Sequence, residues 1–346
     1  MRAAVSVEPR KLVISEDYPM PELRPGDVLV EVELCGICGS DLMDWYVAQK
    51  VPAVLGHEIV GRVAKLDPKL DHGLLVGDRV FVHHHVACGT CRLCRRGKET
   101  LCPSFRSSRI EPGGLAQFVR VPSAHVADGL LHLPDGLSGE TATMIEPLAC
   151  ALRGLKSAGA SRGDRALVVG LGQMGQLYSR ALIAEGVSVV GTDLLPARRT
   201  LAAAVGVVAC APLPEEISAN APAGDPWDLI VLCTGHADAF ALGFAAAGKG
   251  SVVQLFAPPP PGGQLCFDAN RLFFDEITLQ ASYSAVSRDT LAALSLLASG
   301  RLDTTGIVSH RFPLERAAEA METARRQDSV MKVVVEASSP SPSPGT

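Results

Sequence analysis

The stretch ALVVGLGQMGQLYSRALIAEGVSVVGTD, residues 166–193, decides the fold of the second half of this chain. The apolar run ALVV leads into the glycine-rich turn GLGQMG, which is followed by a helical pattern, a second apolar run and Asp193. Four consecutive apolar residues that end at a glycine are typical of a strand buried in a parallel sheet. A strand, a turn, a helix and a second strand in this order predict a β-α-β unit.

The glycine spacing GxGxxG within this unit predicts a binding site for a dinucleotide; the alternative is a glycine-rich loop in an ordinary β-α-β unit. The first two glycines permit a tight turn and the approach of a pyrophosphate, and the third permits close helix–strand packing. Asp193 lies 23 positions beyond Gly170, where such a fold places an acidic residue for the ribose hydroxyls. Its carboxylate favours NAD because it repels a 2′-phosphate, whereas Arg198 and Arg199 keep NADP as an alternative.

Further alternation of short apolar runs with Ala- and Leu-rich stretches predicts more strands and helices after residue 200. The expected strands are 207–209, 229–233, 251–256 and 277–281. With the two strands above they make six, the number in a doubly wound dinucleotide-binding sheet. Thr234 follows the fourth of these strands, at the carboxyl edge where such sheets bind ligands. The predicted cofactor-binding residues are Gly170, Gly172, Gln173, Met174, Gly175, Asp193, Arg198 and Thr234.

The first 150 residues have a different pattern, with short β-rich runs separated by proline and glycine turns. We expect strands at 3–7, 28–34, 59–66 and 78–82. After Gly300, a strand, a helix and a final strand are expected to return to this first domain. The expected organisation is a β-rich domain over residues 1–149, a Rossmann domain over 150–285, a return segment over 286–336 and a disordered tail over 337–346.

Four cysteines at positions 88, 91, 94 and 102 follow the pattern C-x2-C-x2-C-x7-C. Four thiolates within fifteen residues can form a tetrahedral shell around zinc. Because no secretory leader is recognisable, we interpret the ten cysteines as reduced thiols and metal ligands rather than as a disulfide framework. A closed shell has no open coordination position, so this site is expected to stabilise a loop and to take no part in chemistry.

A second metal site is predicted in CGICGSDLMDWYVAQKVPAVLGHEIVG, residues 35–61. Cys38, His57 and Glu58 offer a thiolate, an imidazole and a carboxylate, which together form a ligand set that zinc prefers. The alternative is structural, with Cys38 as a small core residue and His57 as a hydrogen-bonded histidine near a strand. The histidine triplet 83–85 can bind metal, but we interpret it as a strand end that faces solvent or a cleft between domains.

The composition excludes several classes of function. The chain has 346 residues, of which 47% are hydrophobic and 20% charged, as expected for a globular protein with two cores. A formal charge of −5 does not provide the net positive charge that would attract nucleic acid or an anionic membrane. No apolar run approaches the ~20 residues of a membrane-spanning helix. We therefore expect a cytoplasmic protein without a nucleic-acid or membrane partner.

With these residues together, the chain resembles the zinc-containing medium-chain alcohol dehydrogenases, in the branch of the sorbitol and threonine dehydrogenases. The motifs that carry the resemblance, besides the four cysteines and the dinucleotide fingerprint, are GICGSD (36–41), GHE (56–58), VGDRV (76–80), PGGLAQFVRVP (112–122) and EPL (146–148). The resemblance implies an α/β protein in which a GroES-like β-rich catalytic domain, built from two segments, encloses a doubly wound Rossmann cofactor domain.

The resemblance also implies the ligands of the catalytic zinc. Cys38 and His57 match two of them, and Glu146 stands where this branch carries a glutamate. Glu58 is either a direct ligand or the exchange partner of one, and Cys150 is an alternative that we assign to core packing. The predicted metal ligands are thus Cys38, His57, Glu58 and Glu146 at one site and Cys88, Cys91, Cys94 and Cys102 at the other.

The implied reaction is the oxidation of a secondary alcohol to a ketone, with hydride transfer to NAD. The predicted catalytic residues are Ser40, which matches the hydroxyl that accepts the substrate proton, and Glu58. Met43 stands where relatives often have a histidine, and a thioether cannot carry a proton onward. We expect a polyol, sugar or cyclitol substrate, one catalytic and one structural zinc per chain, and a homo-oligomer, either dimer or tetramer. The alternatives are a threonine-like amino alcohol as substrate, or a non-catalytic redox regulator that binds zinc and NAD.

Overall fold

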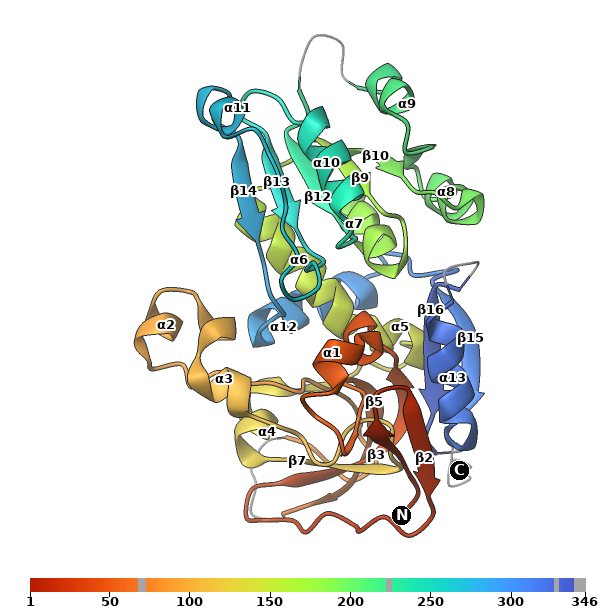
Figure 1. The fold of residues 1–346 in the computed structure, drawn as a ribbon. Coiled ribbons are helices and arrows are strands. Elements are labelled where there is room, and N and C mark those ends of the chain that lie inside the picture. Colours follow the sequence, from red (N-terminus) through yellow and green to blue (C-terminus); the bar gives the residue numbers. More distant parts are fainter. Residues whose placement is uncertain (68–72, 222–225, 327–329, 339–346) are drawn as a thin grey trace. The chain divides into compact units, whose positions relative to one another are not determined.

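The structure is a computed structural model that describes residues 1–67, 73–221, 226–326 and 330–338 (Figure 1). The chain forms two compact units: Met1–Glu146, Val286–Ala298 and Val308–Thr346 belong to the first, and Pro147–Ala285 and Ser299–Ile307 to the second. The sequence analysis placed 299–307 in the return segment of the first domain, whereas the structure groups these residues with the second unit. Apart from Ala337 and Ser338, the expected disordered tail lies outside the described residues.

The first unit contains two sheets, one with strand order β2-β1-β4 and the other with order β15-β16-β3-β5-β6-β8, to which β7 adds beside β3. The strands are β1 Ala3–Glu8, β2 Lys11–Ser15, β3 Val28–Gly36, β4 Ala53–Val54, β5 Glu58–Leu66, β6 Arg79–Val82, β7 Phe118–Val121, β8 Leu130–His132, β15 Val308–Pro313 and β16 Lys332–Glu336. Apolar residues of β3, β5, β7 and β16 are buried in one core, which explains why these β-branched runs form strands. The β-rich first domain is confirmed.

Short helices connect the strands of the first unit. They are η1 Gly39–Leu42, α1 Asp44–Val47, α2 Arg92–Arg95, η2 Glu99–Leu101, α3 Pro103–Ser107, α4 Ser123–Gly129, α5 Gly139–Thr143, α12 Ser287–Ala298, η3 Leu314–Arg316 and α13 Ala317–Ala324. α13 packs against β16, β15 and β2, so the return segment contributes to the same core as the first strands (Figure 1). In the part of the chain that the structure describes, no helix combines the length and hydrophobicity needed to span a membrane.

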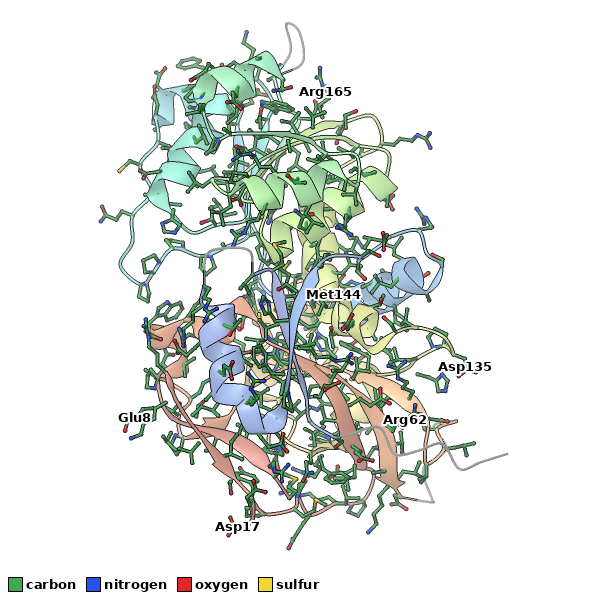
Figure 2. The ribbon with its side chains drawn as sticks, turned by 90° about the vertical axis from the view of Figure 1, so that its right-hand side faces the viewer. Glu8, Asp17, Arg62, Asp135, Met144 and Arg165 are labelled. Atoms are coloured by element: carbon green, nitrogen blue, oxygen red, sulfur yellow. The ribbon has the colours of Figure 1, made fainter. Side chains whose placement is uncertain are left out.

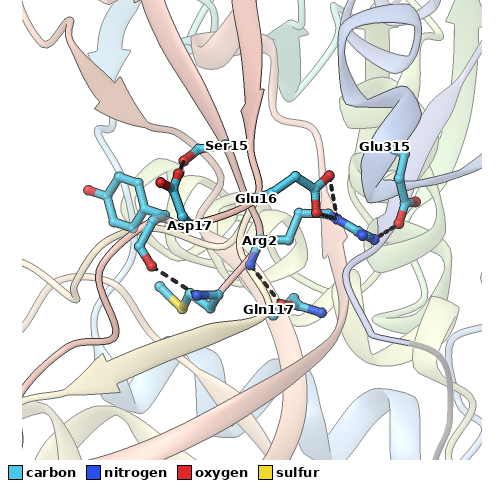
Figure 3. A network of polar contacts seen from close by, with 8 residues as sticks. Arg2, Ser15, Glu16, Asp17, Gln117 and Glu315 are labelled. Atoms are coloured by element: carbon cyan, nitrogen blue, oxygen red, sulfur yellow. Dashed lines mark hydrogen bonds and ion pairs between the residues drawn. The ribbon is translucent and has the colours of Figure 1, made fainter.

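Arg2 links the start of β1 to three other segments of the first unit (Figure 3). Its Nε donates to Glu16 Oε2 over 2.8 Å, and its guanidinium also pairs with Glu315 at η3. Its backbone N–H donates to the side-chain carbonyl of Gln117 over 2.7 Å. Exposed ion pairs of this kind contribute about 0–1 kcal/mol each, so the buried strands provide most of the stability.

The second unit is a six-stranded parallel sheet with the order β11-β10-β9-β12-β13-β14. Its elements are β9 Arg165–Val169, α7 Gln173–Ala184, β10 Ser188–Thr192, α8 Pro196–Ala203, β11 Val208–Cys210, α9 Pro214–Ala219, β12 Leu229–Leu232, α10 Ala237–Ala246, β13 Val252–Leu255, α11 Ala269–Phe274 and β14 Thr278–Ala281. The strand order reverses between β9 and β12, as in a doubly wound dinucleotide-binding fold. The predicted six-stranded Rossmann sheet is confirmed.

We predict that the third glycine of the turn is needed for folding whereas the second tolerates a methyl group. A Cβ at Gly175 would lie 1.9 Å from the carbonyl oxygen of Gly170, while the nearest atom to a Cβ at Gly172 is 3.7 Å away. Overpacking of this kind costs about 1–3 kcal/mol. Thermal unfolding should show a clearly lower Tm for Gly175→Ala and a nearly unchanged one for Gly172→Ala. Equal melting temperatures for the two variants would contradict this account of the turn.

Candidate functional site

An antiparallel strand pair brings two histidines together in the first unit. Ile59 in β5 pairs with Val82 in β6, so the residues just before β5 and just after β6 continue side by side. By this register His57 stands opposite His84, and their ring centroids lie 4.6 Å apart. The hairpin therefore supplies two imidazoles at the same end of the sheet.

Glu146 reaches the same place from another segment. It lies in the first turn of α6 (Ile145–Ala158). Met144, labelled in Figure 2, and Ile145 are fully buried, so the start of α6 is anchored in the core. One ligand atom from each of His57, His84 and Glu146 lies within 4.8 Å of the other two. Imidazole nitrogens and a carboxylate oxygen so close together form a set that zinc binds.

Cys38 belongs to a neighbouring segment and is not one of the three residues of this group. It precedes η1, and its charge acts on the ring of His57 and raises the pKa of that residue. His84 Nδ1 is buried and has no hydrogen-bond partner among the described residues. A buried ring nitrogen is seldom left without a partner, so a molecule bound beside His57 would supply one. The imidazole of His57 and the carboxylate of Glu146, with a thiol on the neighbouring segment, are donor types that fit a zinc ion.

Asp41 positions the ring of His57. Its Oδ1 lies 3.5 Å from His57 Nδ1, its Oδ2 accepts the backbone N–H of Cys38 over 3.3 Å, and the side chain is buried. Burial acts to lower the pKa of His57, but the charges of Asp41 and Cys38 outweigh it and raise this pKa well above its usual value. Burial acts to raise the pKa of Asp41, but His57 outweighs it and lowers this pKa. A carboxylate behind a ligating histidine fixes the orientation of the ring.

Glu58 follows His57 but forms a buried ion pair with Lys332 of β16. Lys332 Nζ also donates to the carbonyl oxygen of Ile37 over 2.9 Å. Gly36 leaves room for this pair, because a Cβ there would lie 2.0 Å from Glu58 Oε2. Of the two glutamates predicted as third ligand, Glu146 thus lies in the metal group and Glu58 pairs with a lysine.

The four predicted cysteine ligands also come together. Their ligand atoms lie within 4.8 Å of one another, and three of the Sγ–Sγ distances are 3.5, 3.6 and 3.9 Å. Cys94 and Cys102 pack with Phe105 and Val286 in a small separate core. None of the four cysteines forms a disulfide. This arrangement fits a closed tetrahedral zinc site, as expected from the spacing.

In the second unit, the carboxylate of Asp193 lies against the glycine-rich turn. Its Oδ2 accepts the backbone N–H of Leu171 over 2.7 Å and its Oδ1 that of Leu195 over 2.8 Å. Arg198 Nη1 lies 3.6 Å from Asp193 Oδ2, and Arg199 Nη1 donates to the Asp193 carbonyl oxygen over 2.6 Å. The acidic residue at the end of β10 is therefore fixed next to the glycine-rich turn.

The other predicted cofactor residues surround the same turn. Gln173 and Met174 open α7, whose N-terminus faces the position of a bound phosphate in such folds. Thr234 lies beside Gly170, because its Cγ2 is 3.5 Å from the place of a Cβ on that glycine. Arg198 lies beside Gly172, because its Nη1 is 3.7 Å from the place of a Cβ on that glycine. Sequence-distant residues thus gather at one edge of the parallel sheet.

His84 is the site residue that the sequence analysis did not assign. The histidine triplet was interpreted as a strand end rather than as a ligand source, and His83 is buried rather than exposed. The available signal was the position of the triplet directly after a predicted strand. The register that sets His84 opposite His57 was not readable from that pattern.

The chain is similar to known dehydrogenases over most of its length. The alcohol dehydrogenase GroES-like domain family matches residues 24–135. Sorbitol dehydrogenase from Rattus norvegicus is 33% identical over 329 residues, 90% of this chain and 89% of that protein. L-threonine 3-dehydrogenase from Chelativorans sp. (strain BNC1) is 30% identical over 97% of this chain and 98% of that protein. The solved alcohol dehydrogenase TADH from Thermus sp. ATN1 has a TM-score of 0.85 at 30% identity, covering 97% of this chain and 99% of that one.

We predict that Lys332 is needed chiefly to balance the buried charge of Glu58. Lys332→Met leaves a carboxylate buried without a counter-ion, which costs about 3–5 kcal/mol. The double variant Glu58→Gln, Lys332→Met removes both charges and should recover much of that loss. Urea unfolding followed by tryptophan fluorescence and circular dichroism measures both. A double variant no more stable than Lys332→Met alone would show that the loss does not come from the unpaired carboxylate.

Proposed function

The chain belongs to the zinc-containing medium-chain alcohol dehydrogenases, and we propose that Cys38, His57 and Glu146 hold its catalytic zinc. The observation that carries this proposal is the convergence of His57 and Glu146 from separate segments onto one point. A fourth protein ligand would close the coordination shell. We therefore assign His84 to the wall of the site beside His57 and leave one position for substrate.

The protein is an oxidoreductase that acts on CH–OH groups, and a secondary alcohol of the polyol, sugar or cyclitol kind is the substrate that we propose. Zinc, when bound, supplies a Lewis acid that lowers the pKa of an alcohol hydroxyl. Nicotinamide, when bound, supplies the hydride acceptor. Ser40 lies in η1 two residues after Cys38, and it accepts the hydroxyl proton as the alcohol is oxidised.

The proton has few routes onward from Ser40. Met43 cannot carry it, because a thioether has no exchangeable proton. The carboxylate of Asp44 is paired with Arg10 over 2.6 Å and with Arg325 over 3.3 Å, so both of its oxygens are already engaged by guanidinium groups. We infer that the proton leaves Ser40 through solvent rather than through a side-chain relay.

For the cofactor we propose NAD. The carboxylate of Asp193 beside the glycine-rich turn favours ribose hydroxyls and repels a 2′-phosphate. Arg198, which lies near both Asp193 and Gly172, is already engaged with that carboxylate. NADP remains the alternative, since an arginine at this position can instead pair with a phosphate.

We further propose a cytoplasmic homo-oligomer, either a dimer or a tetramer. β14 lies at the end of the parallel sheet and pairs with β13 alone among the described strands. Phe273 and Phe274 near this edge are 70% and 71% exposed. An open strand edge next to exposed aromatic rings is a surface that association would cover. Light scattering coupled to gel filtration measures the oligomeric state directly.

We predict two zinc ions per chain with different lability. The ion held by four cysteines has a closed shell and should resist mild chelation, whereas the catalytic ion has an exchangeable position and should be lost first. Metal analysis before and after chelator treatment measures this, and His84→Ala should keep both ions. Simultaneous loss of the two ions, or one ion per chain at the outset, would be inconsistent with this assignment.

We predict that Ser40→Ala lowers kcat/KM for alcohol oxidation by roughly 10²-fold or more, as for loss of a positioned proton acceptor. The measurement is NADH or NADPH formation across a panel of polyols, sugars, cyclitols and amino alcohols with each cofactor. Ser104→Ala, an exposed serine on α3, is the matched control and should be unchanged. Activity restricted to amino alcohols favours the threonine-like alternative, and no turnover of any compound favours a regulator. Wild-type rates in Ser40→Ala would remove Ser40 from the mechanism.

A further inference from the structure

His84 lies beside two of the proposed zinc ligands without being assigned to the ion. One of its ring nitrogens lies within 4.8 Å of the ligand atoms of His57 and Glu146. The rings of His57 and His84 have centroids 4.6 Å apart and are tilted by 46°. All three residues belong to the first compact unit. A small molecule whose reacting hydroxyl lies between His57 and Glu146 therefore also comes close to the ring of His84.

The ring of His84 differs from that of His57 in its hydrogen bonding. Nδ1 of His57 faces Asp41 Oδ1 at 3.5 Å, as is usual for a histidine that ligates a metal. Nδ1 of His84 is buried and has no hydrogen-bond partner among the described residues. Because buried polar atoms are nearly always hydrogen-bonded, the ring of His84 suits a partner that arrives with the substrate.

The backbone around His84 is fixed by contacts that leave its ring uninvolved. The carbonyl oxygen of His84 accepts the Nε2–H of His125 over 3.2 Å. Two residues further on, the backbone N–H of Val86 donates to Ser108 Oγ over 3.0 Å. The ring of His85 packs beside that of His84, with centroids 4.2 Å apart. The imidazole of His84 is thus held in place before any ligand binds, which favours selective recognition.

The chemistry of an imidazole indicates which group it would bind. In its neutral form the ring has one N–H donor and one acceptor nitrogen. A hydroxyl group can accept from the first or donate to the second, whereas a methyl or methylene group can do neither. On a polyol, the hydroxyl of the neighbouring carbon is the polar group nearest to the reacting oxygen. A hydroxyl at that position can satisfy His84 while the reacting hydroxyl lies at the zinc site.

We propose that His84 forms a hydrogen bond with the hydroxyl on the carbon next to the one oxidised, so that the protein prefers vicinal diols to simple secondary alcohols. This inference rests on the proposed function, because it assumes that the reacting hydroxyl lies at the zinc site. His84 is thereby a specificity-determining residue that contacts the substrate and transfers neither the hydride nor the proton. An alcohol without the adjacent hydroxyl leaves the ring nitrogen buried and unpaired, which disfavours its binding.

The test compares butane-2,3-diol, as a mixture of its stereoisomers, with butan-2-ol, which lacks the adjacent hydroxyl. The full-length zinc-loaded protein should have a kcat/KM about tenfold or more higher for the diol. His84→Phe keeps a ring of similar size without nitrogen, so it should remove most of this preference and leave butan-2-ol oxidation nearly unchanged. His84→Asn has a donor and an acceptor and should keep part of the preference. His132→Asn, at an exposed histidine of β8, is the matched control and should behave as wild type.

Calorimetric titration in the absence of NAD measures recognition without turnover. Butane-2,3-diol should bind the zinc-loaded protein saturably, and His84→Phe should weaken this binding about tenfold. Metal analysis should find two zinc ions per chain in both proteins, because the proposal gives His84 no part in holding the ion. Circular dichroism checks that His84→Phe is folded, and His84→Ala takes its place if it is not.

The outcomes separate this inference from the proposed function. The proposal is overturned if the substitution lowers kcat/KM for both alcohols equally or removes the catalytic zinc, since His84 is then a structural residue or a ligand. It is also overturned if the wild-type protein does not prefer the diol or does not bind it saturably. If the protein oxidises no alcohol of the wider panel but binds the diol through His84, the proposed function fails and the assignment of His84 stands.

Discussion

The register of the central antiparallel strands is the constraint on which the metal site depends. Gly36 at the end of β3 pairs with Glu58 at the start of β5, and Ile59 pairs with Val82 at the end of β6. The residues that follow β3, precede β5 and follow β6 therefore lie at the same end of the sheet. A slip of one residue in this pairing would turn every side chain to the opposite face of the sheet and disperse the donor set.

The same register explains the buried ion pair beside the site. Gly36 pairs on its other side with Val334 of β16, so Lys332 crosses the end of β3 and reaches Glu58. Only a residue without a side chain leaves the necessary space at this crossing. A buried pair is weak evidence for stability, since desolvation opposes the attraction of the charges. Its consequence here is that a charged carboxylate stays fixed next to His57.

The two zinc sites differ in how the chain builds them. The four cysteines come from one short loop with its own small core, so their geometry is local. The ligands proposed for the other site come from three segments: Cys38 follows β3, His57 precedes β5, and Glu146 lies in the first turn of α6. A site assembled from distant segments can leave one coordination position open, because no single loop wraps the ion. Chemistry is therefore expected only at the assembled site.

The sequence by itself determined whatever depends on residues close together in the chain. The glycine-rich turn with Asp193, the cysteine pattern and the six strands of the parallel sheet all follow from local spacing, and the fold class is confirmed. Only the tertiary structure placed His84 opposite His57 and brought Lys332 to Ile37, 295 positions away. Such contacts depend on which strands pair and in which register. Hydrophobic alternation predicts a strand, but many registers bury the same apolar face, so the identity of a residue's cross-strand neighbour is decided by the folded sheet.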